Sequence, residues 1–178
     1  MPSAFSHAIV ATAIGKVAEP KVVPGWYWVL GAAASALPDL DVIGFHYGVR
    51  YGDLLGHRGF THSLFFAALL AGVISLALAW QSQISPWRLF LYLFLATASH
   101  GVLDAMTNGG LGVAFFSPFS NTRFFFPFRP IEVSPIGVGR FFSARGPAVV
   151  RSEALWLWLP SVALFAIVSL FRRARRSI

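Results

Sequence analysis

Long apolar segments without charge constrain this chain more than any other feature. No charged residue occurs from Leu64 to Trp80 or from Ala154 to Phe171. Pro86 to Met106 is a third apolar segment, in which Pro86 suits the first turn of a helix. A helix needs about 20 apolar residues to cross the hydrocarbon core of a bilayer. These three segments therefore predict membrane-spanning helices.

The first forty residues predict a helical hairpin. Ala4–Ala18 and Gly25–Leu37 are both apolar and short, so the hairpin either spans thinly or packs inside the bundle. Pro38 is expected to end the second arm, because the residue before proline is pushed out of the helical region. Residues 107–153 predict a long loop rich in Phe, Pro and Gly. The expected fold is a single all-α domain over residues 1–178, a polytopic membrane bundle with four to five hydrophobic helices.

The composition favours lipid over water as the solvent. Hydrophobic residues make up 56% of the chain and charged residues 12%, whereas soluble domains carry about 25% charged residues. The net charge of +7 does not indicate nucleic-acid binding, because basic residues cluster after the last apolar segment and no lysine-rich surface is evident. The chain has no cysteine, so disulfides and thiolate metal sites are excluded. No removable signal peptide is expected, since no basic leader precedes the first apolar segment.

The basic tail also predicts an orientation. Arg172, Arg173, Arg175 and Arg176 follow the last apolar segment and are expected in the cytoplasm. Alternating the segments from there places Arg88 inside as well. Arg123, Arg129, Arg140, Arg145 and Arg151 fall outside, so the orientation rests on the tail and the short loops. The same alternation brings most of the Asp and His residues to the outer face, and these candidate metal ligands are His7, Asp39, Asp41, His57, His62, His100 and Asp104.

The spacing of these residues suits a metal site. His100 and Asp104 are four residues apart and share one helix face. Asp39 and Asp41 follow the end of a helix, and His57 and His62 flank a tight turn before the next helix. Ionisable groups at membrane helices are costly and usually functional. Nitrogen and carboxylate ligands suit one or two divalent ions, with zinc first and manganese or iron as alternatives.

Each group also has an ordinary structural interpretation. His100 and Asp104 could form a helix hydrogen bond, and the Asp39 and Asp41 pair could serve as cap and turn residues. His57 and His62 could lie among lipid headgroups, and His7 could be a packed residue on an apolar helix. Their joint placement at one face favours metal. The remaining acidic and histidine residues are expected to be ordinary interfacial polar residues: Glu19, His46, Asp53, Glu132 and Glu153.

A metal would give these residues catalytic roles. Metal binding lowers the pKa of water and yields a nucleophile near neutral pH. An uncoordinated carboxylate such as Asp41 could act as general base. Arg58 could stabilise a phosphate or another anion. Arg123 and Arg129 could do the same, although contact with lipid headgroups is the more ordinary interpretation.

Four parts of the sequence carry a family resemblance: His7, Leu37–Asp41, the His-Arg-Gly-Phe-Thr-His run within Gly56–Ser63, and Ser99–Thr107. With these, residues 5 to 135 resemble the YdjM-like family of inner-membrane metal-dependent hydrolases. The resemblance implies a multi-pass membrane hydrolase with a divalent metal. The order of residues is also similar, more distantly, to the helical zinc-dependent phospholipase C group. That similarity implies ligand roles for His7, Asp39 or Asp41, His57 or His62, His100 and Asp104. No histidine follows His100, so a third metal is not expected.

The sequence therefore predicts a metal-dependent hydrolase of a phosphoester, such as a phospholipid or lipid-linked phosphate, in the inner or plasma membrane with its site on the extracytoplasmic face. Asp39, His57, His62, His100 and Asp104 are the first candidates for metal, with Asp41 and His7 as further ligands. A non-catalytic membrane protein with a structural metal site for partner binding is the alternative. A transporter fits less well, because the uncharged segments offer no polar path.

Overall fold

A computed structural model gives the fold of residues 1–18, 23–136 and 145–175. Within these residues the regular structure is helical and no strand occurs, only isolated bridges between Thr107 and Ile131 and between Val113 and Phe124. The all-α prediction is confirmed. Parts of the predicted hairpin turn and loop, with Arg140 and Arg176, lie outside the described residues. The α-helices are α1 (Ala4–Ala18), α2 (Gly25–Ala36), α3 (Leu64–Ala77), α4 (Pro86–Ala105), α6 (Gly146–Glu153) and α7 (Leu159–Ala174).

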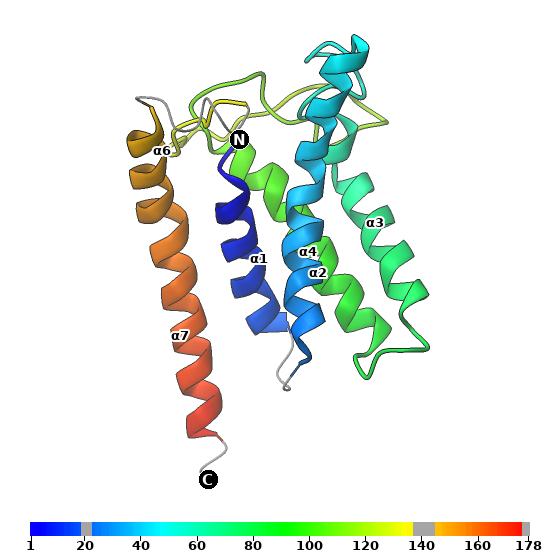
Figure 1. Ribbon diagram of the computed structural model, residues 1–178, viewed down its shortest axis with the longest axis vertical. Coiled ribbons are helices and arrows are strands. Elements are labelled where there is room, and N and C mark those ends of the chain that lie inside the picture. Colours follow the sequence, from blue (N-terminus) through cyan, green and yellow to red (C-terminus); the bar gives the residue numbers. More distant parts are fainter. Residues whose placement is uncertain (19–22, 137–144, 176–178) are drawn as a thin grey trace.

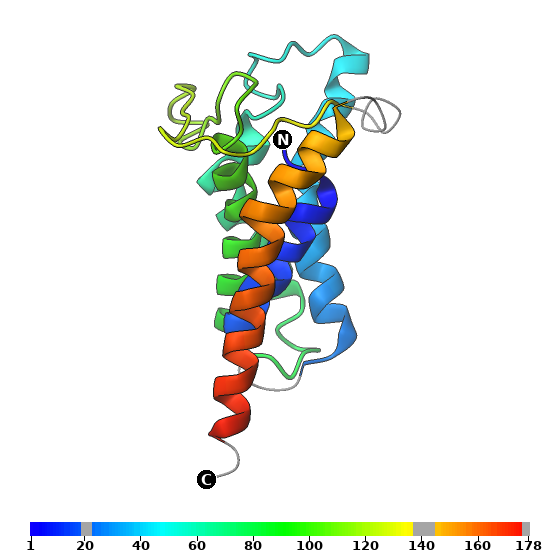
Figure 2. The same ribbon diagram turned by 90° about the vertical axis from the view of Figure 1, so that its left-hand side faces the viewer.

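Helices α1 to α4 pack together, and α7 runs along α1 and extends past the bundle (Figures 1 and 2). The packing centres on Tyr92 of α4, whose ring stacks on Tyr27 with centroids 4.2 Å apart. A Cβ atom at Gly15 or Gly31 would collide with the Tyr92 ring. These two glycines therefore let α1 and α2 approach α4 closely.

Fewer helices are long and apolar enough to cross a membrane than the four to five that the sequence predicts. Among the residues that the structure describes, two continuous helical stretches meet the criterion by length and composition, Gly25–Tyr47 and Gly146–Ala174. Helices α1 and α3 are apolar but shorter. The 14 residues of α3 rise about 21 Å, less than the ~30 Å of a hydrocarbon core. The helix ends at Ala77, so the apolar segment to Trp80 overstates its length.

Two predicted boundaries also differ from the structure. Helix α2 ends just before Pro38, but the chain continues as a 3₁₀ helix, η1 (Leu37–Tyr47), and so stays helical beyond it. The predicted loop ends early, because α6 begins at Gly146 with a proline in its first turn. A π-helical turn, η3 (Ala154–Trp158), joins α6 to α7 just before Pro160. The π turn fits a proline that lacks an N–H group.

One end of the bundle gathers the polar segments. The start of α1, the end of α2, the short 3₁₀ turn η2 (Phe60–His62) before α3, and the end of α4 lie there next to the loop of residues 107–136, and η1 projects past that loop (Figure 1). The C-terminal end of α7 lies at the opposite end. Chain direction alone therefore brings together residues that are far apart in the sequence.

Candidate metal centre

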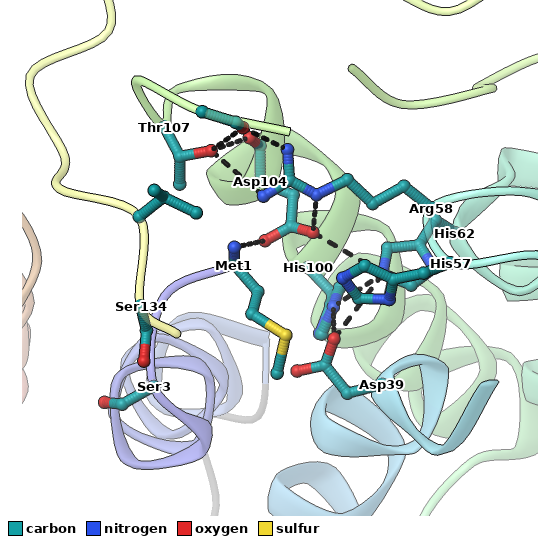
Figure 3. Close-up of polar contacts among 12 residues, drawn as sticks. Met1, Ser3, Asp39, His57, Arg58, His62, His100, Asp104, Thr107 and Ser134 are labelled. Carbon is teal, nitrogen blue, oxygen red and sulfur yellow. Dashed lines mark hydrogen bonds and ion pairs between the residues drawn. The ribbon is translucent and has the colours of Figure 1, made fainter. Parts of the chain in front are cut away.

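Four of the candidate ligands converge from three separate segments. His100 and Asp104 project from one face of α4 and are fully buried. Asp39 comes from η1 and His62 from η2. One ligand atom from each of these residues lies within 4.8 Å of all the others. We call these four residues, shown in Figure 3, the metal cluster.

The contacts inside the metal cluster are close. The His100 Nε2 atom lies 3.2 Å from Asp39 Oδ1 and 3.1 Å from His62 Nε2. The His62 Nε2 atom is 3.5 Å from Asp104 Oδ2 and 3.7 Å from Asp39 Oδ1. None of the carboxylate oxygens of Asp39 and Asp104 has a partner with hydrogen-bond geometry. Asp104 has the Arg58 guanidinium beside it, with Nε 2.9 Å from Oδ2. Buried carboxylate oxygens without hydrogen-bond partners are costly, and a bound cation would compensate the remaining charge of the two residues.

Neighbouring acceptors determine which ring nitrogens face the cluster. The His100 Nδ1 atom lies 2.6 Å from the Ser35 carbonyl oxygen, which can only accept a hydrogen bond. The His62 Nδ1 atom lies 3.0 Å from Thr61 Oγ1, whose hydroxyl proton goes to Asp41, and 3.2 Å from Asp41 Oδ2, so both oxygens can only accept from it. Both Nδ1 atoms therefore donate, and in the neutral rings both Nε2 lone pairs point into the cluster. Metal-binding histidines are oriented in this way by outer carboxylates and carbonyls.

Without an ion, a proton compensates the cluster. Burial lowers the pKa of His62, but its contacts with Asp104, Asp39 and Asp41 outweigh this and raise the pKa to about 10. A proton shared between the two Nε2 atoms also explains their 3.1 Å separation, because two facing lone pairs would repel. An incoming cation would displace that proton.

Asp41 and His57 lie beside the metal cluster. The Asp41 carboxylate contacts His57 Nδ1 at 2.8 Å and accepts a hydrogen bond from Thr61 Oγ1 at 2.8 Å. Asp41, His57 and His62 form a second group with metal-ligand spacing. Both groups take a ligand atom from His62. A neutral imidazole has a single free lone pair, so the two groups compete for His62.

Arg58 is buried next to the cluster and its donors are engaged. Its backbone has a φ of 63°, in the left-handed region, and its side chain is 0% exposed. The Nε atom lies 2.9 Å from Asp104 Oδ2, and the Nη atoms donate to Gly109 O and Thr107 Oγ1. The other Asp104 oxygen lies 3.8 Å from the amino group of Met1. The catalytic roles predicted for Arg58 and Asp41 stay predictions.

His7 lies against the metal cluster rather than within it. Its ring stacks on His100 with centroids 3.7 Å apart and an interplanar angle of 13°. The ring is fully buried and neither nitrogen has a hydrogen-bond partner. The predicted role of His7 as a ligand stays a prediction at this point.

Sequence reasoning missed two structural residues at this end. Arg123 donates to the carbonyl oxygens of His57 at 2.9 Å and Tyr51 at 3.1 Å, so it secures the loop before η2. Glu153, expected at the interface, is fully buried. An acidic residue just before the apolar segment was the available signal for Glu153, but its partners lie about 150 positions away.

The other loop arginine considered for anion binding, Arg129, lies over the Phe125 ring with its guanidinium carbon 4.8 Å from the ring centroid.

Glu153 ties the start of α1 to the junction of α6 and η3. Its carboxylate accepts hydrogen bonds from Ser3 N at 2.6 Å, Ser3 Oγ at 2.6 Å and Ser6 Oγ at 2.7 Å. We expect Glu153→Ala to lower the free energy of unfolding by about 2 kcal/mol, because buried donors would lose a charged acceptor. Thermal unfolding in detergent checks this, with the exposed Glu132→Ala as control. Equal stability of both variants would contradict it.

Comparison with known proteins gives a consistent membrane assignment. A family model described as YdjM inner membrane protein matches residues 1–177. The chain is 38% identical over 174 residues to Inner membrane protein YbcI of Escherichia coli (strain K12), a match that covers 97% of this chain and 100% of that protein. No solved structure matches the chain.

Proposed function

Because the chain belongs to the YdjM inner membrane protein family, we propose that it is a multi-pass membrane hydrolase that uses a divalent metal, zinc by preference, to cleave a phosphoester. The ion would be held by Asp39, His62, His100 and Asp104. One observation carries the proposal: two histidines whose Nδ1 atoms are already engaged direct their Nε2 atoms at two buried carboxylates, within 4.8 Å. Manganese or iron would suit the same nitrogen and oxygen donors.

The surrounding residues would position the ligands. Asp41 would hold His62 through Nδ1, with Thr61 donating to the same carboxylate oxygen. Arg58 would orient Asp104 and partly neutralise it at 2.9 Å. A bound divalent ion would supply Lewis-acid activation of water and stabilise charge on a phosphoryl oxygen. Outer-shell partners of this kind typically change metal affinity or activity 10–100-fold.

The membrane position supports a lipid-borne substrate. The loop above the metal cluster exposes large aromatic side chains, with Phe119 81% and Phe128 58% exposed. Exposed apolar surface of this kind marks a site of contact with a membrane or another protein. We place the longer helical stretches, the shorter apolar helices α1 and α3, and α4, which packs against α1, α2 and α3, in the membrane together. With Arg172, Arg173 and Arg175 in the cytoplasm at the far end of α7, the cluster would face the extracytoplasmic side (Figure 1).

Metal titration of the purified, chelator-treated protein tests the proposal. We expect about one equivalent of Zn²⁺ to bind, because the two candidate groups share His62. Protons compete for His62, whose pKa is raised to about 10, so the ion must displace one. The apparent affinity should therefore rise about tenfold per pH unit between pH 6 and 8. Calorimetry in two buffers of different ionisation enthalpy measures the number of Zn²⁺ equivalents bound and the number of protons released. Absence of binding at pH 8 would end the proposal.

A structural metal site is the second candidate, favoured by the closure of the cluster. His62, His100 and Asp104 are 3% exposed or less, and the Asp39 side chain is 12% exposed. Structural zinc sites are closed by protein ligands, whereas catalytic sites keep one position open. Turnover of a panel of phospholipids and phosphodiesters by the zinc-loaded protein separates the two. Full metal occupancy without any turnover would favour the structural site.

A further inference from the structure

His7 combines two properties that need an explanation. It is a polar ring with 0% exposure, and neither Nδ1 nor Nε2 has a hydrogen-bond partner. A buried polar group without a partner typically costs about 1–3 kcal/mol. Such groups in native structures mark a bound water, an ion or a catalytic role. Because His7 lies against the His100 ring of the metal cluster, its geometry relative to that ring decides between a bound water, an ion and a catalytic role.

The stacked geometry argues against a shared ion. A ring nitrogen directs its lone pair in the plane of its ring, so an ion bound to His100 Nε2 lies near the plane of His100, at about 2.0–2.1 Å for zinc. The His7 ring is nearly parallel to that plane, at 13°, with its centroid 3.7 Å away. Stacked carbon atoms stay about 3.5 Å apart, so the lone pairs of His7 lie in a separate, parallel plane. One ion cannot lie in both planes.

We propose that His7 serves the metal cluster without binding its ion. The His7 ring fixes the orientation of His100 by stacking on its face. This contact does not interfere with the edge of the His100 ring, where Nδ1 is held by Ser35 O at 2.6 Å. The free nitrogens of His7 hydrogen bond an oxygen of the water or phosphate that joins the ion. A neutral imidazole offers one donor and one acceptor, so it can serve either oxygen. This inference rests on the proposed metal-dependent function and concerns the same site.

The surroundings of His7 favour this role over simple packing. Its neighbour in the chain, Ser6, donates to Glu153 Oε2 at 2.7 Å and accepts from Trp158 Nε1 at 2.7 Å. Those bonds hold the first turn of α1 in place and leave the His7 ring without a partner of its own. An apolar ring would fill the same space without the cost of two unpaired nitrogens. The imidazole therefore suits a polar ligand that arrives with the ion.

Cobalt binding by full-length variants tests the proposal, because Co²⁺ reports its ligands through visible absorption. His7→Phe keeps a ring that can stack and loses no protein hydrogen bond, whereas His7→Ala removes the stack and His100→Ala removes a ligand. We expect His7→Phe to bind one Co²⁺ with the wild-type spectrum and His7→Ala to bind about tenfold more weakly. Inorganic phosphate should alter the wild-type cobalt spectrum, and His7→Phe should need about tenfold more phosphate for the same change.

The outcomes separate this inference from the proposed function. Loss of Co²⁺ from His7→Phe, to the extent seen in His100→Ala, would make His7 a ligand and overturn the inference while the metal centre stands. A phosphate response that is absent from wild type, or equal in wild type and His7→Phe, would overturn it too. Failure of the wild type to bind Co²⁺ would remove both the proposed function and the inference.

Discussion

Asp39→Asn is expected to weaken binding of the divalent ion by at least about 100-fold while the protein stays folded. The substitution removes a charged ligand from the metal cluster, whereas loss of outer-shell partners alone costs 10–100-fold. The carboxylate lies 3.2 Å from His100 Nε2 and 3.7 Å from His62 Nε2, and the amide has nearly the same shape and keeps an oxygen that can accept a hydrogen bond from either ring. In the metal-free protein the change also removes a negative charge near Asp104. The weaker contacts with His62 and His100 and the weaker repulsion of Asp104 act in opposite directions, so the unfolding temperature without metal should stay close to that of wild type. Metal content should fall to background.

One matched variant controls this experiment. Asp53→Asn makes the same change at a side chain 38% exposed, which pairs with Arg50 on the surface. Asp53→Asn should keep metal content and stability at wild-type levels. Metal analysis by mass spectrometry after gel filtration, with thermal unfolding of the same samples, gives both readouts. Full metal content in Asp39→Asn would exclude Asp39 as a ligand. A lower unfolding temperature without metal would show that Asp39 is a structural residue.

The candidate ligands could be predicted from the sequence, but not which of Asp39 and Asp41 faces the metal cluster. His100 and Asp104 could be assigned to one face because four residues separate them on an α-helix. Asp39 and Asp41 could not be separated in the same way. In a 3₁₀ helix with three residues per turn, positions two apart point about 120° from one another. Because η1 has this geometry, Asp39 faces the cluster and Asp41 faces His57.

Other features depend on contacts between distant residues and carry no local signal. Glu153 is buried because α1 and α6 meet, with Ser3 and Ser6 as donors. Arg58 donates hydrogen bonds to Thr107 and Gly109 because the loop after α4 folds over η2. Apolar segments predicted helices correctly, yet composition does not mark where an apolar helix ends. Hence the number of long helices was overestimated while the all-helical fold was right.

Arg58→Met is expected to destabilise the metal-free protein by about 3–5 kcal/mol, the cost of breaking a buried ion pair by removing one partner. Arg58 and Asp104 are both 0% exposed, with Nε and Oδ2 2.9 Å apart. Methionine keeps much of the apolar stem, and it inherits the same left-handed backbone with a φ of 63°. The loss therefore reports mainly on the carboxylate left without its cation. Chemical unfolding in mild detergent measures it.

Three comparisons make this result specific to the charge. In Arg58→Met/Asp104→Asn the unpaired carboxylate is gone, so the double variant should recover part of the stability that Arg58→Met loses. Arg50→Met breaks the exposed pair with Asp53, whose atoms are 3.3 Å apart, and should leave stability unchanged. Zn²⁺ should also restore stability to Arg58→Met, since a divalent cation beside Asp104 replaces the missing charge. If neither the double variant nor Zn²⁺ recovers stability, Arg58 acts through its hydrogen bonds to Thr107 and Gly109 rather than through Asp104.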